Sequence, residues 1–249
     1  MKKIIALMLV IMLTALSVIF VGCDKNKPID AGEANNGGEQ TTEETTSSVV
    51  NKELSSDAAE AYDQIRKLIL EKATQYCMDF KMTEADEFVR VVRKAAQNGD
   101  YVMIDQGVGL TEIYVMDNVG YVKSPDVDGF VASSDSEAVG SLKQTIKETE
   151  QFNDISFPDD INEDVVVDVT DSTLGGVKIT FTDKDNSNNK YVVETDSKVY
   201  EITEDGEVIG SGITKIKITF VAADTNGGTT TLDCVYTEIN GKITLKSPL

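Results

Sequence analysis

The stretch Tyr76-Cys77-Met78-Asp79-Phe80-Lys81-Met82-Thr83 decides the fold that this sequence predicts. Its large apolar side chains alternate with smaller or polar ones, and this period of two is typical of a strand that buries one face. Such a strand needs neighbours that supply the rest of an apolar sheet face. The apolar positions are Tyr76, Met78, Phe80 and Met82.

The next segments continue the sheet. By its apolar spacing, the segment 87–97 fits either a strand or a helix. We favour a strand, because Asn98-Gly99 is a strong hairpin turn and the apolar run 101–104 follows it at once. The same pattern continues through 110–116 and 120–123, which a hairpin turn at Asp117-Asn118 is expected to join.

The chain after Pro158 is almost entirely short strands joined by turns. Alternation is clearest at 177–182 and 213–221. Further strands are expected at 165–167, 191–194, 199–203, 230–237 and 242–245, with hairpin turns at Glu204-Asp205-Gly206, Asn226-Gly227-Gly228 and Asn240-Gly241. The pattern predicts a continuous antiparallel sheet with one apolar face, and a sheet of this size is expected to curl.

Two amphipathic helices are predicted to pack on this sheet. The first begins after Asp57, with Glu60 completing a capping box, and continues for about eighteen residues. The second begins near Ser134, with Glu137 as its capping partner, and ends near Glu150. The predicted fold class is therefore α+β and mostly β: a curved antiparallel sheet, as in a half-barrel, with an N-terminal helix and a second helix packed on it.

The N-terminus combines a basic start with a long apolar run. Lys2 and Lys3 precede residues 4–21, which are apolar apart from Thr14 and Ser17. A segment of this kind is recognised by the export machinery. The run is long enough to approach a membrane span, so an uncleaved anchor is the alternative to cleavage.

Phe20-Val21-Gly22-Cys23 ends this run and resembles the lipobox of bacterial lipoproteins. In that family a small residue precedes a cysteine that is acylated on sulfur and becomes the new N-terminus. Gly22 and Cys23 match the pattern, whereas Phe20 stands where Leu is usual. The resemblance implies a signal peptide at 1–22, lipidation of Cys23 as the membrane contact, and a place at the extracytoplasmic face of the cell membrane.

The rest of the chain divides into a linker and a domain. Residues 23–54 are mostly Gly, Asn, Glu, Thr and Ser, so we expect a lipidated N-terminus followed by a disordered acidic tether. No second linker or internal repeat follows. Residues 55–249 are therefore expected to form a single domain.

The chain is strongly acidic, with 43 Asp and Glu against 23 Lys and Arg and a formal net charge of −20. A nucleic-acid-binding protein needs a basic surface to release counterions from phosphates, so nucleic acid is not an expected partner. The chain also lacks His and Trp. Because the absence of His excludes Ser-His-Asp and Cys-His catalysis and His-ligated metals, we expect neither enzyme activity nor a cofactor.

Two cysteines remain beside Cys23. Cys77 lies on the polar side of its predicted strand, whereas Cys234 lies on the apolar side of its own. An exported pair invites a disulfide. Side chains on opposite faces of one sheet cannot be joined in this way, so we predict two unpaired thiols.

Two groups of acidic residues are candidates for a metal site or a catalytic pair. Asp183-Lys184-Asp185-Asn186-Ser187 with Glu194 at the twelfth place approximates an EF-hand calcium loop, but Asn188 replaces the turn glycine and strands are predicted on both sides. Asp159-Asp160 and Glu163-Asp164 could be imagined as a glycosidase acid and base, yet Trp is absent and the acids lie in loops. Solvated loops explain both groups, and no metal site is expected.

The layout of lipobox, tether, leading helix and many strands resembles that of the lipoprotein carriers of the LolA/LppX type. The stretch Thr111-Glu112-Ile113-Tyr114-Val115-Met116-Asp117, followed by Gly120-Tyr121-Val122, also looks like the paired strands of related Gram-positive lipoproteins. This resemblance implies a half-barrel that encloses an apolar cavity. It carries over no binding residue beyond Cys23.

The apolar side chains of the opening stretch then have two interpretations. Tyr76, Met78, Phe80 and Met82 either line a cavity for a lipid or acyl chain, since Met and aromatic side chains make adaptable surfaces, or belong to an ordinary packed core. The first interpretation makes the chain a non-enzymatic lipoprotein that binds or carries an apolar ligand. The alternative function is a cell-surface interaction or sensor module that binds a protein partner.

Overall fold

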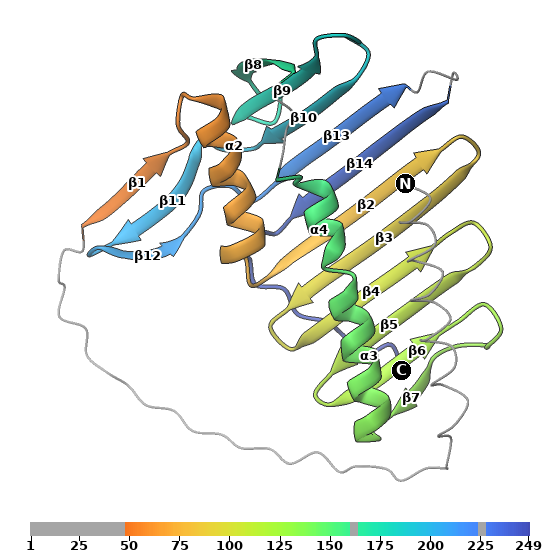
Figure 1. Cartoon of the computed structure of the whole chain (residues 1–249). Coiled ribbons are helices and arrows are strands. Elements are labelled where there is room, and N and C mark those ends of the chain that lie inside the picture. Colours follow the sequence, from red (N-terminus) through yellow and green to blue (C-terminus); the bar gives the residue numbers. More distant parts are fainter. Residues whose placement is uncertain (1–47, 160–163, 224–227) are drawn as a thin grey trace.

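The computed structural model describes residues 48–159, 164–223 and 228–249. The predicted signal peptide, Cys23 and most of the predicted turn at Asn226-Gly227-Gly228 lie outside these ranges. Figure 1 shows a large curved sheet, a band of helices across one of its faces, and a small sheet to one side. We call the face against which the helices pack the inner face.

Within the described ranges, eleven antiparallel strands form the large sheet, and its two edges do not meet (Figure 1). The predicted α+β, mostly β class is therefore confirmed, as is the strand assigned to 87–97. In spatial order the strands are β7 (Val131–Ser133), β6 (Val119–Lys123), β5 (Leu110–Met116), β4 (Gly99–Asp105), β3 (Glu87–Ala96), β2 (Tyr76–Glu84), β14 (Thr229–Thr237), β13 (Ile216–Ala223), β10 (Lys190–Thr195), β9 (Val177–Asp183) and β8 (Val165–Asp171).

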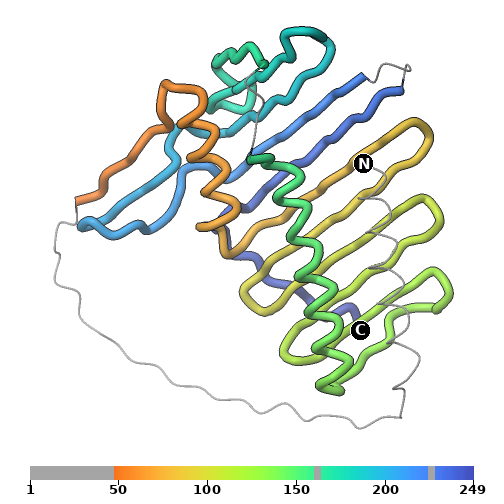
Figure 2. Tube along the Cα trace, in the orientation of Figure 1, coloured from red at the N-terminus to blue at the C-terminus, as the bar shows by residue number. Residues whose placement is uncertain are grey.

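Successive hairpins build one half of this sheet, from β2 to β7, and the path is easily followed in Figure 2. Asp117 and Asn118 between β5 and β6 both have positive φ, which suits a tight hairpin turn. Gly99 at the start of β4 has a φ of 147°, and a Cβ there would lie 2.1 Å from the carbonyl oxygen of Val115. Only glycine fits at this close approach.

Helix α2 (Ala58–Lys67) begins where the sequence predicts, because the Asp57 carboxylate accepts a hydrogen bond from the Glu60 amide at 3.0 Å. The capping box is incomplete, since the Glu60 side chain accepts from the Ser55 hydroxyl instead. A π-helical turn, η1 (Leu68–Lys72), ends the helix a little earlier than predicted. Its buried side packs on the inner face through Ala61, Tyr62, Ile65, Leu68 and Ile69.

Replacing Asp57 with alanine is expected to lower the free energy of unfolding by about 1 kcal/mol, because the cap satisfies an otherwise unpaired amide. Urea unfolding of residues 48–249 would measure the change. Glu71→Ala, on the exposed side of η1, is the matched control. Equal stability of Asp57→Ala and the unsubstituted protein would contradict the role of the cap.

Helix α3 (Ser136–Glu148) begins one to two residues later than predicted. The cap is Asp135 rather than Ser134, and its carboxylate accepts from the amides of Glu137 and Ala138. A charged acceptor at the helix N-terminus explains the choice. A short helix that the sequence did not predict, α4 (Gln151–Ser156), follows, with Phe152 and Phe157 buried against the sheet.

Three other strands form a separate sheet: β1 (Val49–Glu53), β11 (Val199–Glu204) and β12 (Glu207–Gly210). The expectation of one continuous sheet is thus wrong for 199–203. The expected tether 23–54 is also too long, because its last residues form β1 and pair with β11. The folded part therefore begins before Ser55. The predicted hairpin turn at Asp205-Gly206 is confirmed by the β11–β12 pairing.

Residues 242–245 were predicted as a strand and do not form one. Their backbone is instead held by the β3–β4 turn: the Leu245 amide donates to Asn98 Oδ1 at 2.8 Å, and Asn98 Nδ2 donates to the Leu245 carbonyl at 3.0 Å. The side-chain amide of Asn98 thus makes the two backbone hydrogen bonds that a neighbouring strand would otherwise make with Leu245. Leu245 packs with Tyr101 and Met116, in a small apolar cluster on the outer face of the sheet.

Glu201 on β11 joins the small sheet to the helix η1. Its carboxylate is buried and binds Lys52 on β1 and Lys72 on η1, the latter at 3.0 Å. The hydrogen bond from Lys52, followed by that from Lys72, lowers the pKa of Glu201. The stabilisation is therefore present above the ordinary Glu pKa of about 4.3 and is lost as the pH falls through the lowered folded pKa.

We accordingly expect Glu201→Gln to destabilise the protein at neutral pH and to have a smaller effect under acid conditions. Urea unfolding of both proteins at neutral pH and at about pH 3, well below the ordinary Glu pKa, would measure this. Glu207→Gln on the exposed strand β12 serves as the control. A difference that stays constant across this pH range would show that the ion pairs with Lys52 and Lys72 are not its cause.

Candidate ligand-binding face

Strand register arranges the inner-face side chains in rows that cross the sheet, and the row nearest the hairpin ends of the central strands consists of aliphatic and aromatic side chains. It runs across seven neighbouring strands, from β8 to β3, near the end of β2 that leads into the β2–β3 hairpin. We call it the apolar row. Its members are Val167, Phe181, Tyr191, Phe220, Leu232, Met82 and Val89, each directly opposite the next.

The next row along the strands is more deeply buried. It includes Ile179, Val193, Ile218, Cys234, Phe80 and Val91, all 0% exposed, whereas Leu232, Met82 and Val89 of the apolar row are 5 to 8% exposed. Figure 1 shows why: α2, α4 and α3 cross the sheet nearer to the start of β2 and the end of β3, away from the β2–β3 hairpin. The apolar row therefore lies at the less shielded end of the inner face.

The four residues predicted to line a cavity fall into different rows, because they follow one strand. Phe80 packs on Phe152 of α4, with ring centroids 4.8 Å apart, and Met78 is 1% exposed. Tyr76 accepts a hydrogen bond from Asn153 Nδ2 at 3.0 Å. These three are packed between the sheet and α4, as in a core. Met82 alone belongs to the apolar row.

The other members of the apolar row could not be assigned from the sequence. Alternation placed Phe220 and Leu232 on apolar strand faces, yet their position beside Met82 depends on β14 pairing with β2, which joins segments about 150 residues apart. The position of Val89 depends on local sequence instead, since the short hairpin that pairs Glu84 with Glu87 sets Val89 opposite Met82.

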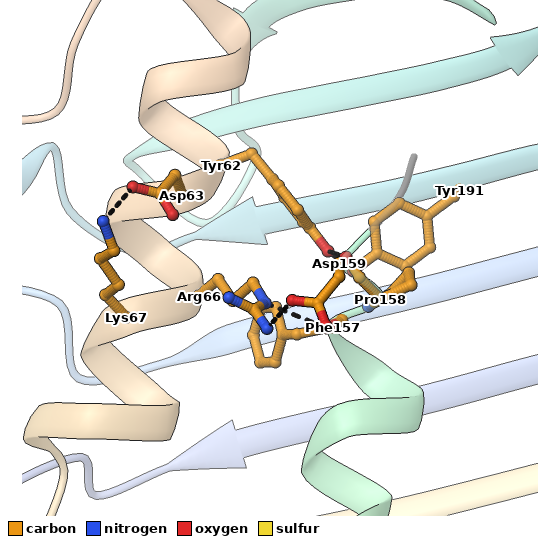
Figure 3. Close-up of polar contacts among 8 residues, drawn as sticks. All are labelled: Tyr62, Asp63, Arg66, Lys67, Phe157, Pro158, Asp159 and Tyr191. Carbon is orange, nitrogen blue, oxygen red and sulfur yellow. Dashed lines mark hydrogen bonds and ion pairs between the residues drawn. The ribbon is translucent and has the colours of Figure 1, made fainter. Parts of the chain in front are cut away.

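The end of α4 is fastened to α2 and to the sheet by hydrogen bonds to its backbone carbonyls (Figure 3). Tyr62 donates to the Pro158 carbonyl at 2.9 Å, and Tyr191 donates to the Ser156 carbonyl at 2.7 Å. Arg66 of α2 contacts both the Phe157 carbonyl and the Asp159 carboxylate. This cluster fixes one end of the helix band over the part of the apolar row on β9 and β10, where the Tyr62 ring packs on Phe181 and Tyr191 with ring centroids 5.5 and 5.9 Å apart.

Burial keeps these phenols in their neutral form. Loss of solvent raises the pKa of Tyr62 to about 12 and raises the pKa of Tyr191 well above its ordinary value. Both hydroxyls therefore remain donors at physiological pH, which the carbonyl acceptors require. Two hydrogen bonds of Asn153 also join α4 to the sheet. Its Nδ2 donates to the Tyr76 hydroxyl, and its Oδ1 accepts from the Tyr236 hydroxyl at 2.9 Å.

Arg93 on β3 is a buried cation among the side chains of the inner face, and it is 6% exposed. Nη2 donates to Glu150 Oε1 at 2.9 Å and lies 3.9 Å from Asp100 Oδ1. The guanidinium stands over the Tyr76 ring, 5.6 Å from its centroid. Burial is the main cause that raises the pKa of Asp100. Arg93 was not considered from the sequence, although alternation puts it on the side of Val89 and Val91.

The two cysteines within the described ranges are unpaired, as predicted. Cys234 opposes Phe80 on the inner face, while Cys77 opposes Thr237 on the outer face and donates to Glu238. Burial raises the pKa of Cys77 to about 11 and that of Cys234 to about 12. Both thiols are therefore protonated and unreactive at neutral pH.

The loop proposed as a weak calcium candidate is an ordinary hairpin loop between β9 and β10. Asp183 accepts from the amides of Asp185 and Asn186 and from Asn189, so its oxygens are already used within the loop. Glu194 binds Ser172 instead. Within the described part of the chain, no group of three or more acidic or Cys side chains is arranged to hold a metal ion.

The structure does not bring the acids of Asp159-Asp160 and Glu163-Asp164 together as a catalytic pair within the described residues. Asp159 binds Arg66, and Asp164 lies 4.0 Å from Lys184. Asp160 and Glu163 lie outside the described residues. Among the helices that the structure describes, none is long and apolar enough to cross a membrane.

Comparison with known proteins gives little further information. No protein-family model matches the chain, and no curated protein is similar to it. One similar solved structure is the crystal structure of a DUF1329 family protein from Desulfovibrio piger. The match covers 76% of this chain and 95% of that protein's chain, with 10% sequence identity and a TM-score of 0.23. A likeness at that TM-score supports no conclusion about function.

Proposed function

We propose that this chain is a lipid-anchored extracytoplasmic lipoprotein, without enzyme activity, that binds an apolar ligand such as an acyl chain on the inner face of its sheet. The apolar row carries the proposal. Its side chains lie in register at the less shielded end of the inner face, and there Phe220, Leu232, Met82 and Val89 offer apolar contacts to an acyl chain. The lipobox-like segment supplies the anchor, and the resemblance to LolA/LppX-type carriers agrees with this function.

The sheet suits this task because it is curved and open rather than closed. A helix band that crosses only part of the inner face leaves the part of the apolar row on β13, β14, β2 and β3 near the hairpin ends (Figure 1). The phenols and Arg66 that fasten α4 keep that band in place when a ligand occupies the row. Met82 is the residue of the original stretch that we expect to contact the ligand, and Tyr76, Met78 and Phe80 support it from the core.

A photoreactive fatty acid tests the proposal in the membrane where the protein works. Cells that express the full chain are fed a diazirine-bearing fatty acid, irradiated, and the modified peptides are identified by mass spectrometry. We expect light-dependent adducts at Met82, Val89, Phe220 or Leu232. Adducts confined to the covalent lipid on Cys23, or adducts spread evenly over the protein, would refute an inner-face site.

A matched pair of variants sharpens this experiment. Phe220 lies in the apolar row, whereas the next residue, Val221, points to the opposite face and is 38% exposed. Phe220→Ala should lower the yield of inner-face adducts, while Val221→Ala should leave it unchanged. Equal yields for the two variants would place the fatty acid elsewhere.

The second candidate function, binding of a protein partner, is favoured by the edge strand β8. Val166, Val167 and Val169 on this strand are 57, 41 and 37% exposed, and within the described residues β8 pairs with β9 alone. A free strand edge can accept an extended segment of another protein. Chemical cross-linking in intact cells separates the functions, since one stoichiometric partner with cross-links at Val165–Asp171 would favour this second function.

A further inference from the structure

We propose that Arg93 binds the anionic head group of a single-chain amphiphile whose apolar chain extends along the inner face toward Val89 and Met82. This inference rests on the proposed function and names the chemical class of its ligand. It begins from an unusual placement: a guanidinium on the apolar face of a sheet, between Met78 of β2 and Val102 of β4. A buried cation in such a place is costly unless its donors are paired.

The donors of Arg93 are only partly paired. Nη2 binds Glu150, but among the residues that the structure describes neither Nε nor Nη1 has a hydrogen-bond partner. Buried donors without partners cost free energy, and charged ones cost the most. An anionic group with several acceptor oxygens would satisfy them, because guanidinium groups bind carboxylates and phosphates with two parallel hydrogen bonds.

Apolar side chains lead from Arg93 to the less shielded end of the sheet. Along the inner face of β3 the order is Arg93, Val91 and Val89, and four residues of strand span about 13 Å. Phe80 and Met82 flank this path on β2, and Ile104 flanks it on β4. Val91 and Phe80 are 0% exposed and the Phe152 ring packs on Phe80, so that ring has to move for a hydrocarbon chain to lie on the path. The arrangement matches a ligand with one charged end and an extended hydrocarbon chain.

Glu150 is the group that such a head would replace. It lies between α3 and α4, its side chain is 51% exposed, and it reaches Arg93 from the solvent side. Because its side chain is half exposed, the Glu150 carboxylate regains hydration when it turns into water, and the anionic head group takes over its hydrogen bond from Arg93, so that the buried cation stays paired. Exchange of one anion for another leaves the local charge unchanged, with Asp100 still 3.9 Å from Arg93.

The head group is thus a carboxylate or a phosphate, and probes with each distinguish them. The full chain is placed in nanodiscs of neutral phosphatidylcholine and labelled with three diazirine probes of equal chain length: a fatty acid, a lysophosphatidate and a fatty alcohol. Adducts on the peptide that contains Val89 and Val91 are quantified against probe concentration. We expect half-maximal labelling by at least one anionic probe at a concentration about tenfold or more below that of the alcohol, the scale of a charged hydrogen bond.

Variants assign the preference to Arg93. Arg93→Met should abolish the preference for the anionic probe and leave labelling by the alcohol unchanged, and Arg93→Lys should restore part of it. Glu150→Gln should strengthen labelling by the anionic probe, because it removes the competing carboxylate. Lys94→Met removes a positive charge one residue away on the outer face and should have no effect. Thermal unfolding of each variant shows whether it is folded.

The outcomes separate this inference from the function on which it rests. Equal labelling by acid, lysophosphatidate and alcohol would refute the role of Arg93 and leave an apolar site intact. Absence of all inner-face labelling in the unsubstituted protein would refute the proposed function itself. An anionic preference that survives in a folded Arg93→Met variant would also overturn the inference, as would weaker anionic labelling in Glu150→Gln.

Discussion

Cys23→Ser is expected to move the protein from the membrane fraction to a soluble or secreted form, or to leave it as an unprocessed precursor, and to abolish its labelling by palmitate. The reason is chemical, since in bacterial lipoproteins the thioether that holds two acyl chains forms on the sulfur of the lipobox cysteine, and two chains give firm anchoring where one is marginal. The folded part is strongly acidic and is repelled by anionic lipid head groups, so it is not expected to hold the protein at the membrane.

The measurement is metabolic labelling with an alkyne-bearing palmitate, followed by fractionation of the cells. Cys77→Ser is the matched control, because it removes a different thiol that already donates to Glu238 on the outer face of the sheet. Labelling should persist in the control. If Cys23→Ser were still labelled and still membrane-bound, the lipoprotein assignment would be wrong, and an uncleaved apolar anchor over residues 4–21 would take its place.

Local periodicity predicted the strands and their buried faces, because side-chain direction in a strand depends only on neighbouring residues. Alternation in 76–83 and 87–96 is found unchanged in β2 and β3. Turn chemistry was equally local: Asp117-Asn118 and Asp205-Gly206 form the predicted hairpins. Such features could be predicted from the sequence alone.

Long-range pairing could not be predicted in this way. Residues 199–204 alternate much as 190–195 do, yet they leave the large sheet, because β1 from the far end of the chain pairs with them. The segment 49–53 was assigned to the tether, since its neighbours are polar and its own side chains remain exposed. Its strand is stabilised by β11 and by the contacts of Glu201, which no short window of sequence contains.

The candidate site depends on the same long-range pairing. The sequence identified Met82, but its neighbour Leu232 on β14 and the next member of the row, Phe220 on β13, lie more than a hundred residues away in the sequence. It also grouped Met82 with Tyr76, Met78 and Phe80, because the period along one strand does not show which positions a helix will cover. The unpredicted helix α4 makes that distinction by burying Phe80 under Phe152.

Phe80→Ala is expected to lower the free energy of unfolding by about 3 to 5 kcal/mol, the range for truncating a fully buried Phe. Phe80 is 0% exposed and packs between Cys234 and Val91 of the neighbouring strands and Phe152 above. The cavity left behind would be closed on all sides, so its neighbours could relax only in part. Urea unfolding of residues 48–249, followed by far-UV circular dichroism, would measure the loss.

Phe220→Ala provides the decisive contrast, because Phe220 is the same residue type on the same face but only partly buried. We expect it to cost clearly less stability than Phe80→Ala and to reduce fatty-acid adducts in the photolabelling experiment more. Equal losses of stability would mean that the apolar row is as tightly packed as the core, which leaves no place for a ligand. The comparison therefore tests directly whether the less shielded end of the inner face is a binding surface or a continuation of the core.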